Sequence, residues 1–226
     1  MMTELEQLEL LERKLERLEA AQACRNLMGR YCYYHCAFRN REYVELWARR
    51  ADDLLVMPWG EYRGFEGVKT CYLEDHGDRS DPAVYERHRG SVMIHEMDTE
   101  IIEVAADGQT AKGCWLTPGS ETYVDREGDG KGHAEWCWGK YAVDFIKEDG
   151  VWKFWHMRLY PLFKAEYGKS WVDYPQPEAP EDFLFGKAEP GPKPWVYAPD
   201  RLYPADEPPI PAPYATFGDV GITFEY

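Results

Sequence analysis

The sequence has no long apolar run and few basic residues, and both absences narrow its function. No segment of its 226 residues approaches the roughly 18 consecutive apolar residues of a membrane-spanning helix. Only 26 Lys and Arg stand against 41 Asp and Glu, which gives a formal net charge of −15. Because binding to phosphate groups depends on clustered cations, we expect neither nucleic acid nor an anionic membrane as a partner.

The sequence also lacks the motifs of disulfide, metal and nucleotide chemistry. Its six cysteines form no CxxC pair and the charged N-terminus carries no apolar signal segment, so free thiols in a cytoplasmic protein are expected. Cys32 and Cys36 lie one helical turn apart, but no second ligand pair has matching spacing, so we expect no metal. With no Gly-rich phosphate loop, GxSxG elbow or dinucleotide fingerprint, no cofactor is expected either.

The N-terminal part of the chain is predicted to be helical. Four leucines recur at alternating three- and four-residue spacing among charged residues, which is typical of an amphipathic helix with a narrow apolar stripe: Leu8, Leu11, Leu15 and Leu18. The helical pattern continues over Gln22–Phe38, and a further short helix is predicted over Glu42–Arg49. The leucine stripe requires a partner surface.

From residue 53 onward the pattern changes to strands. The hairpin turns Asp107-Gly108 and Asp149-Gly150 separate some of them, and a helix is predicted over Phe65–Glu74. The predicted strands are Leu54–Met57, Val92–Val104, Ala111–Thr117, Glu135–Lys147 and Val151–Leu159. Helices followed by a run of strands indicate an α+β fold, with helices covering one face of a strongly curved antiparallel sheet.

The C-terminal region differs in composition from the rest, since 12 of the 16 prolines lie between Pro175 and Pro213. Such a segment cannot build a core, yet it carries several aromatic residues, so we expect an extended arm over this subunit or a neighbour. The chain is therefore divided into an N-terminal helix extension (1–20), an α+β domain (21–165) and a Pro-rich arm (166–226). The stripe and the arm together predict a homo-oligomer.

The middle of the chain resembles a known family. A predicted strand that contains His95, within Ile94–Val104, is followed by the turn Asp107–Ala111 and a returning strand. This order resembles the histidine-containing hairpin of SnoaL-like proteins, in the NTF2-like superfamily. There, the histidine opens a strand and the returning strand lines a pocket.

Further matches follow in the same order. Gly132-His133-Ala134 and Asp149–Phe154 look like the closing strands of scytalone dehydratase, and Arg158-Leu159-Tyr160 is similar to the end of the last strand in bile-acid 7α-dehydratases. Arg30-Tyr31 fits the first long helix of the family. The resemblance covers Leu18–Phe163 and implies an NTF2-like cone, in which a curved antiparallel sheet wraps around a cavity under the N-terminal helices. Relatives with this chain plan are commonly trimers.

The resemblance implies roles for three residues. His95 would face the cavity and move a proton, where the alternative is a half-buried histidine bonded to a carbonyl. Tyr31 would hold or protonate a leaving oxygen, and otherwise is a core aromatic residue. Arg158 would stabilise negative charge on the substrate, and otherwise forms a surface ion pair.

The sequence departs from its relatives at two positions. The bile-acid dehydratases carry an Asp five residues after the helix tyrosine, whereas that offset from Tyr31 gives Cys36 here. Trp115 stands near the place of the second histidine of scytalone dehydratase. His35 could substitute for the missing Asp, because positions i and i+4 are neighbours on a helix, or else the reaction differs.

Aromatic residues are numerous at positions that could face the cavity. A flat aromatic substrate would suit such walls, although ordinary core packing accounts for some of them. The predicted substrate-binding residues are Tyr34, Trp59, Trp115, Tyr141 and Phe145. Trp136 and Trp138 have the opposite strand parity from Tyr141 and are predicted to lie in a subunit interface.

These observations predict a cofactor-independent lyase that acts on an aromatic or polycyclic small molecule by acid–base catalysis. Dehydration is one form, and carbon–carbon cleavage with release of formaldehyde, as in the diarylpropane lyases of the superfamily, is the other. The alternative from another class is a non-catalytic binding or assembly module on the same fold. Isomerisation of the ketosteroid-isomerase type ranks third, because the sequence offers no Asp that can be placed as its base.

Overall fold

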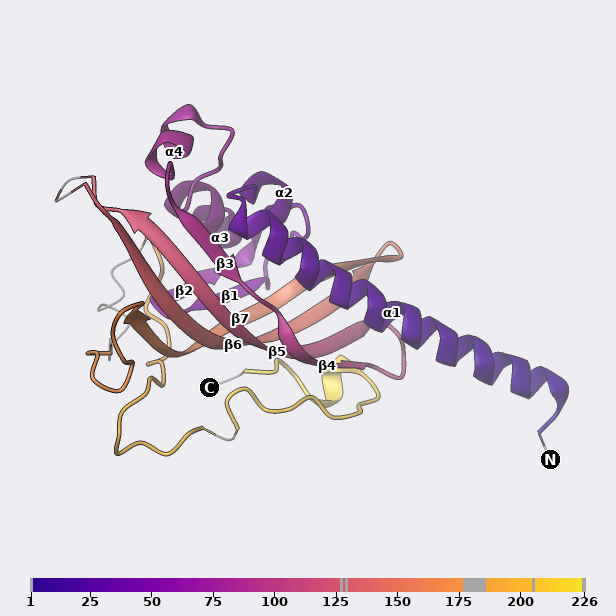
Figure 1. Cartoon of the computed structure of the whole chain (residues 1–226). Helices are drawn as coiled ribbons and strands as arrows, with labels where there is room; N and C mark the ends of the chain where they lie inside the picture. Colours follow the sequence, from indigo (N-terminus) through magenta and orange to yellow (C-terminus); the bar gives the residue numbers. More distant parts are fainter. Residues whose placement is uncertain (1, 127, 129, 177–185, 205, 225–226) are drawn as a thin grey trace.

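A computed structural model describes residues 2–126, 128, 130–176, 186–204 and 206–224. It has the expected α+β cone, with helices at the N-terminal side of a strongly curved sheet (Figure 1). Helix α1, Glu4–Cys36, is a single helix of 33 residues that passes through the predicted boundary at residue 20 without a break. It starts with a capping box, which consists of two hydrogen bonds. The Glu6 backbone N–H donates to the Thr3 hydroxyl, and the Thr3 backbone N–H donates to the Glu6 carboxylate.

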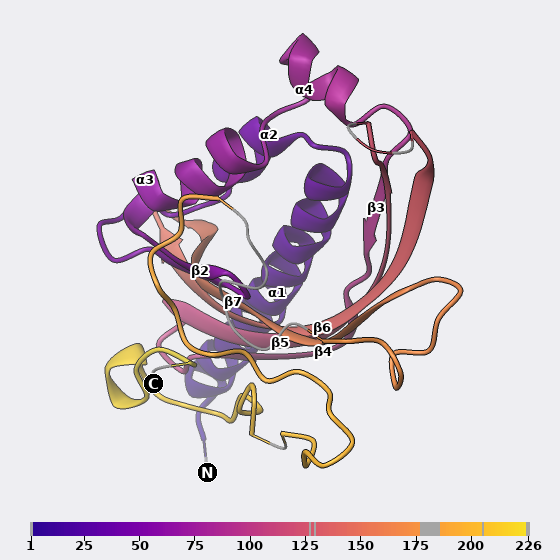
Figure 2. The same ribbon diagram turned by 90° about the vertical axis from the view of Figure 1, so that its left-hand side faces the viewer.

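Three short helices follow α1 and sit over the opening of the curved sheet (Figure 2). They are α2 (Asn40–Val44), α3 (Gly64–Lys69), which continues into a π-helical turn (Thr70–Asp75), and α4 (Pro82–Arg87). Helix α4 was not predicted, although Asp81 caps it and Pro82 occupies its first turn. No helix among the described residues is long and apolar enough to cross a membrane.

The sheet has seven strands in the order β2-β1-β7-β6-β5-β3, with β4 also paired to β5. Its strands are β1 (Leu54–Met57), β2 (Gly60–Arg63), β3 (Val92–His95), β4 (Asp98–Val104), β5 (Thr110–Val124), β6 (Gly132–Glu148) and β7 (Val151–Glu166). The prediction of a purely antiparallel sheet is wrong at one pairing, because β1 runs parallel to β7. The sheet is therefore mixed.

Strand ends differ from the prediction for identifiable reasons. The predicted strand Val92–Val104 is broken after His95, opposite Pro118 of β5. Pro118 accepts a hydrogen bond from the Glu96 backbone N–H but has no N–H of its own to return, so the ladder is interrupted there. β5 nevertheless continues past Pro118 to Val124, and β7 continues past Leu159 to Glu166.

The concave face of the sheet and the inner face of α1 enclose the main core. Much of this core is aromatic, and its largest fully buried side chains include Trp47, Tyr31, Tyr43, Tyr72, Tyr141, Phe145 and Phe154. One end of the cone is thus filled by side chains instead of forming an empty cavity. Among the described residues, a cavity with space for a ligand lies toward the other end of β5, β6 and β7.

Part of the described C-terminal arm packs on the convex face of its own sheet (Figures 1 and 2), and another part pairs with the edge strand β2, where Glu189 and Glu61 exchange backbone hydrogen bonds. Phe224 joins a second apolar cluster with Leu54, Val56 and Tyr160. The Tyr197 backbone N–H donates to the Leu162 carbonyl at 2.8 Å. The described part of the arm therefore packs on its own subunit, whereas the sequence left open whether it would cover this subunit or a neighbour. Residues 177–185 of the arm lie outside the described residues.

A buried carboxylate anchors the end of the arm. Asp144 is fully buried on β6, where Lys112 Nζ donates to its Oδ1 at 3.1 Å and His156 Nδ1 lies 3.0 Å from its Oδ2. Thr223 of the arm donates to the same carboxylate through its backbone N–H and its hydroxyl. Burial raises the pKa of Asp144, but the hydrogen bond to His156 and the charge of Lys112 outweigh it, so the pKa lies below its usual value.

We expect Asp144→Asn to lower the free energy of unfolding by about 3–5 kcal/mol at neutral pH, because it leaves Lys112 buried beside a neutral amide. Since folding lowers the pKa of Asp144, its contribution is complete above the unfolded pKa near 4 and is lost as the pH falls through the folded pKa. Urea unfolding at neutral and acidic pH measures both effects. Asp149→Asn, the same change at an exposed turn residue, is the control and should change little.

Candidate active site

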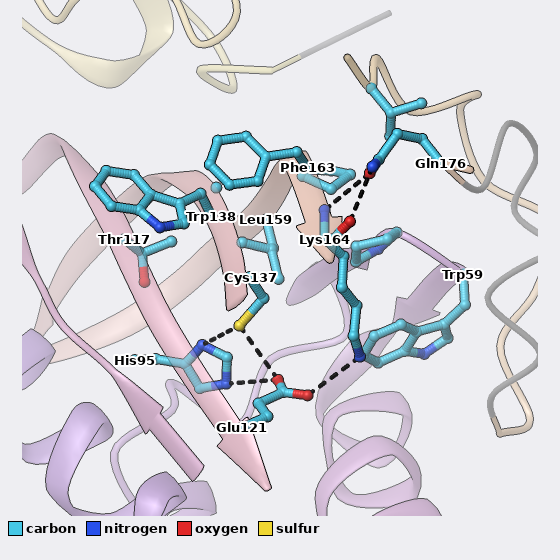
Figure 3. Close-up of a pocket in the computed structure, with 14 residues that line it drawn as sticks. Trp59, His95, Thr117, Glu121, Cys137, Trp138, Leu159, Phe163, Lys164 and Gln176 are labelled. Carbon is cyan, nitrogen blue, oxygen red and sulfur yellow. Dashed lines mark hydrogen bonds and ion pairs between the residues drawn. The ribbon is translucent and has the colours of Figure 1, made fainter. Parts of the chain in front are cut away.

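A cavity of about 130 Å³ opens at the end of the cone opposite the aromatic core (Figure 3). It lies over the C-terminal half of β5, the N-terminal half of β6 and the C-terminal half of β7, and the β1–β2 turn closes one side. Its lining includes polar and reactive side chains beside apolar ones: Trp59, His95, Thr117, Glu121, Cys137, Trp138, Leu159, Phe163, Lys164 and Gln176.

His95, Glu121 and Cys137 form a compact group in this cavity, one from each of β3, β5 and β6. His95 Nε2 lies 3.2 Å from Glu121 Oε1, while His95 Nδ1 lies 4.0 Å from Cys137 Sγ. The Cys137 thiol donates to the same Glu121 oxygen at 3.5 Å. Figure 3 shows the imidazole, the thiol and the carboxylate in a triangle, each in contact with the other two. The carboxylate therefore orients the ring.

A glycine permits this close approach. Gly119 pairs with both His95 and Cys137 across the sheet. A Cβ atom at Gly119 would meet Cys137 Sγ at 2.7 Å, the Ile94 carbonyl oxygen at 2.9 Å and His95 Nδ1 at 3.0 Å. These separations are shorter than van der Waals contact, so any larger residue would push the imidazole and the thiol apart.

Lys164 supplies a positive charge to the same end of the cavity. Its Nζ lies 3.3 Å from Glu121 Oε2 and 2.7 Å from Glu135 Oε2. Burial lowers the pKa of Lys164, but the two carboxylates outweigh it and the net shift is upward, so the ammonium stays charged. Burial likewise raises the pKa of Glu121, while the hydrogen bond from His95 and the charge of Lys164 bring it well below the usual range.

Two cysteines of α1 fix the backbone of His95. The Cys32 thiol donates to the His95 carbonyl oxygen at 2.9 Å, and the His95 backbone N–H donates to Cys36 Sγ at 3.4 Å. The interaction between the two neighbouring thiol groups is the largest cause that lowers the pKa of Cys36, to about 6, and raises the pKa of Cys32. The one-turn spacing of Cys32 and Cys36 thus serves to hold the end of β3 against the helix.

His35 lies directly behind His95. The two rings stack with centroids 5.8 Å apart, and His35 also stacks on Tyr31 at 5.3 Å. Burial, together with the neighbouring histidines His76 and His95, lowers the pKa of His35 well below its usual value, and burial lowers that of His76. Both rings are therefore neutral at neutral pH, so His35 is a buried neighbour of His95.

Tyr31 and Tyr141 lie deeper in the cone. Both are almost completely buried, and their hydroxyl oxygens are 2.7 Å apart. Each hydroxyl thereby gains a partner that the surrounding aromatic core does not otherwise offer. The structure brings Tyr31 next to His35, but neither tyrosine lines the cavity that contains His95.

The other predicted aromatic residues are divided between cavity and core. Trp59 lines the cavity and donates through Nε1 to the Tyr62 hydroxyl at 2.9 Å. Trp115 and Phe145 pack edge to face in the core at 6.1 Å, and Tyr34 packs against the core from α1. Most of the residues that were predicted from the sequence to bind the substrate therefore lie in or against the core.

Arg158 is not brought to the cavity. It alternates along β7 with Met157, a core residue, and Leu159, which lines the cavity, so its side chain lies on the convex face. Its guanidinium lies 4.3 Å from the centre of the Tyr160 ring there. Trp138 is among the residues that line the cavity and stacks on Phe163 at 5.9 Å, while its predicted place in a subunit interface stays a prediction.

The charged residues and the thiol that lie beside His95 in the cavity were not predicted as site residues from the sequence: Glu121, Cys137 and Lys164. Glu121 and Lys164 lie beyond the predicted strand ends at Thr117 and Leu159. Extending the alternation of β5 from Trp115 by two residues at a time would have placed Glu121 on the concave face. Lys164 follows an irregularity in the pairing of β6 with β7 after Trp138, so alternation alone would have given its side wrongly.

The same three groups, His95, Glu121 and Cys137, could hold a metal ion, since one ligand atom from each lies within 4.8 Å of the others. A nitrogen, an oxygen and a sulfur are all donors that Zn²⁺ accepts. The ammonium of Lys164 beside Glu121 opposes a dication at this place, because it already balances the carboxylate charge. The geometry favours the protonic roles of these residues.

Comparison with known proteins agrees with this fold. Among solved structures, the chain is similar to a scytalone dehydratase-like protein from Novosphingobium aromaticivorans, with 18% identity, a TM-score of 0.52, and coverage of 68% of this chain and 91% of that one. It is also similar to the hexachlorocyclohexane dehydrochlorinase LinA-type3 from Novosphingobium barchaimii, with 19% identity, a TM-score of 0.51, and coverage of 72% and 99%. No curated protein matches the sequence.

The family itself is assigned by sequence. The SnoaL-like domain matches residues 16–158, which is more than half of the chain and includes α1 from Glu16, the short helices and the sheet as far as the middle of β7. The match contains His95, Glu121 and Cys137, whereas Lys164 and the arm lie beyond it. The chain belongs to the SnoaL-like family, of the NTF2-like superfamily.

Proposed function

We propose that the protein is a cofactor-independent lyase that acts on a small aromatic molecule. The observation that carries this proposal is the pairing of His95 with Glu121 at 3.2 Å on the wall of an open cavity. An imidazole held by a carboxylate can take a proton from a substrate carbon, because the carboxylate stabilises the imidazolium that forms. The dehydratase and dehydrochlorinase among the similar structures are both named for elimination reactions.

The size of the cavity favours a single aromatic ring beside His95. A cavity near 150 Å³ in another protein holds one benzene molecule, and this one measures about 130 Å³. Apolar contacts from Leu159 and Trp59 suit the faces of such a ring. A second ring of a diaryl substrate would then lie at the mouth, against Trp138 and Phe163.

Lys164 takes the role that the sequence gave to Arg158. As the proton leaves the substrate for His95, negative charge grows on a carbonyl or phenolic oxygen. A charged ammonium at the cavity wall stabilises that oxygen electrostatically. In a dehydration the electron pair of the broken carbon–hydrogen bond forms a double bond, and the expelled hydroxyl group takes the proton from His95 and leaves as water. In carbon–carbon cleavage a hydroxymethyl group gives its hydroxyl proton to His95 and leaves as formaldehyde, while the electron pair of the broken bond forms a double bond and expels a hydroxyl group from the neighbouring carbon, which takes that proton and leaves as water. Both forms use one base and one cation.

Two other functions compete with the lyase. An isomerase of the ketosteroid type needs a carboxylate base, and Glu121 is available in the cavity, but its lowered pKa makes it a weak base. A non-catalytic binding module remains the alternative from another class, because the aromatic filling of the cone leaves little internal space. For the lyase and for both of these alternatives, we propose that the protein is a homo-oligomer in the cytoplasm, and the family resemblance predicts a trimer.

We expect His95→Asn to lower kcat by roughly 10²–10⁴-fold, because it removes the proton acceptor. Glu121→Gln should lower kcat by roughly tenfold or more with a smaller effect on KM, since the ring loses its orienting carboxylate. A panel of hydroxylated phenols and diarylpropane diols, followed by absorbance and by formaldehyde release, provides the assay.

His133→Gln, at a histidine that stacks on Tyr123 and does not line the cavity, is the matched control for His95. Circular dichroism confirms that each variant is folded. Full activity of folded His95→Asn would exclude His95 as the base. Compounds that bind without turnover, with His95→Asn changing affinity alone, would favour the binding module.

Tyr31 supports the site through its hydroxyl pair with Tyr141. We expect Tyr31→Phe to cost about 1–2 kcal/mol of unfolding free energy, because the Tyr141 hydroxyl is left buried without a partner. The double variant Tyr31→Phe/Tyr141→Phe should cost less than the sum of the single changes. A loss of kcat in Tyr31→Phe as large as that in His95→Asn would instead make Tyr31 the direct proton donor.

Metal removal should leave the enzyme unchanged. Dialysis against a chelator should alter neither kcat nor Tm, because the proposed chemistry uses only side chains of this chain. The measurement pairs activity with a thermal melt before and after treatment. Loss of activity that added zinc restores, and that Cys137→Ser abolishes, would show that His95, Glu121 and Cys137 act as metal ligands.

A further inference from the structure

The N-terminal half of α1 carries an apolar surface that no described part of this chain covers. Five of its leucines are exposed to between 57% and 69% of their surface: Leu5, Leu8, Leu11, Leu15 and Leu18. This half of the helix extends beyond the end of the sheet (Figure 1). Exposed leucines in such number are unusual for a surface that faces only water.

Four of the leucines, Leu8, Leu11, Leu15 and Leu18, form a heptad seam. Their spacing of three, four and three residues places them at successive a and d positions of a coiled coil. At about 100° per residue, the centre of this seam lies roughly 180° around the helix from the residues that α1 buries against the sheet, Ala20, Cys24, Leu27 and Met28. The seam therefore points away from the sheet on which α1 packs; at its C-terminal end Leu18 and Lys14 line a groove beside β4, where Leu18 is still 69% exposed.

The charges beside the seam select the orientation of that neighbour. With Leu8 and Leu15 at a positions, Lys14 occupies a g position and Glu12 and Glu19 occupy e positions. In a parallel pair, each Lys14 lies opposite Glu19 of the other helix, which is attractive. In an antiparallel pair, Lys14 would face Lys14 and Glu12 would face Glu12, which is repulsive.

We propose that the exposed N-terminal half of α1 binds a second copy of this chain as a parallel, in-register coiled coil. The seam leucines interlock between the two helices, and Lys14 pairs with Glu19 on both flanks. The helix is already fixed by the packing of its C-terminal half on the sheet, so pairing does not have to nucleate it. This inference is independent of the proposed function.

Sedimentation velocity of the full chain over a wide concentration range tests the proposal. We expect a reversible oligomer whose Kd rises at least roughly tenfold with Leu11→Glu, because burial of two leucines is lost and two carboxylates are brought together. Leu11 is exposed in the single chain, so the variant should remain folded by circular dichroism. A single-chain mass at every concentration, or an oligomer that Leu11→Glu leaves unchanged, would overturn the proposal.

Charge reversal tests the parallel orientation. Lys14→Glu and Glu19→Lys should each raise the Kd by roughly two- to tenfold, and the double reversal Lys14→Glu/Glu19→Lys should restore it, because the pair is remade with opposite signs. Arg13→Glu, a charge reversal on the side of the helix opposite the seam, is the control and should have no effect. Additive losses in the double variant would exclude the parallel pair. A mass of three chains with full rescue would support the same parallel seam shared by three helices.

Discussion

The alternation of side chains along β5, β6 and β7 is the constraint on which the rest of the structure depends. Successive residues point to opposite faces of the sheet, so each strand carries two separate sets of contacts. The concave face combines Tyr141 and Phe145 of the core with Glu121 and Cys137 of the cavity. The convex face carries the buried Asp144, which binds the end of the arm. A shift of one residue would exchange the two sets, so the register fixes the site.

This constraint also explains how far the sequence could predict the molecule. Helical leucine spacing, hairpin turns and the His95 motif were sufficient for the fold and the family, because each is a local signal. Arg158 was misplaced even though its neighbour Leu159 faces the cavity, since the resemblance was given more weight than strand parity. Glu121 and Lys164 were missed because the ends of strands are poorly marked in sequence: the predicted strand ended at Thr117, whereas β5 continues past Pro118, which only interrupts the pairing with β3 and β4.

Charge in the cavity is confined to a few groups by burial. His35 and His76 are held neutral by their surroundings, so they pack against the site without adding to its field. Glu121 stays ionised because His95 and Lys164 are both within hydrogen-bonding or ion-pairing distance. One anion thus links the imidazole to the ammonium. Cys32 and Cys36 of α1 hold the backbone of the same histidine.

Helix α1 connects this site to the proposed seam between copies. Its C-terminal half contributes Cys32 and Cys36 to the support of His95, while its N-terminal half carries the leucines, of which Leu18 is the nearest, about 20 Å from Cys32 along the helix at 1.5 Å per residue. The seam faces away from the sheet, so pairing leaves the mouth of the cavity at Trp138 uncovered. All the described groups of the site come from one chain. Self-association would therefore stabilise the long helix on which the histidine depends without completing the site.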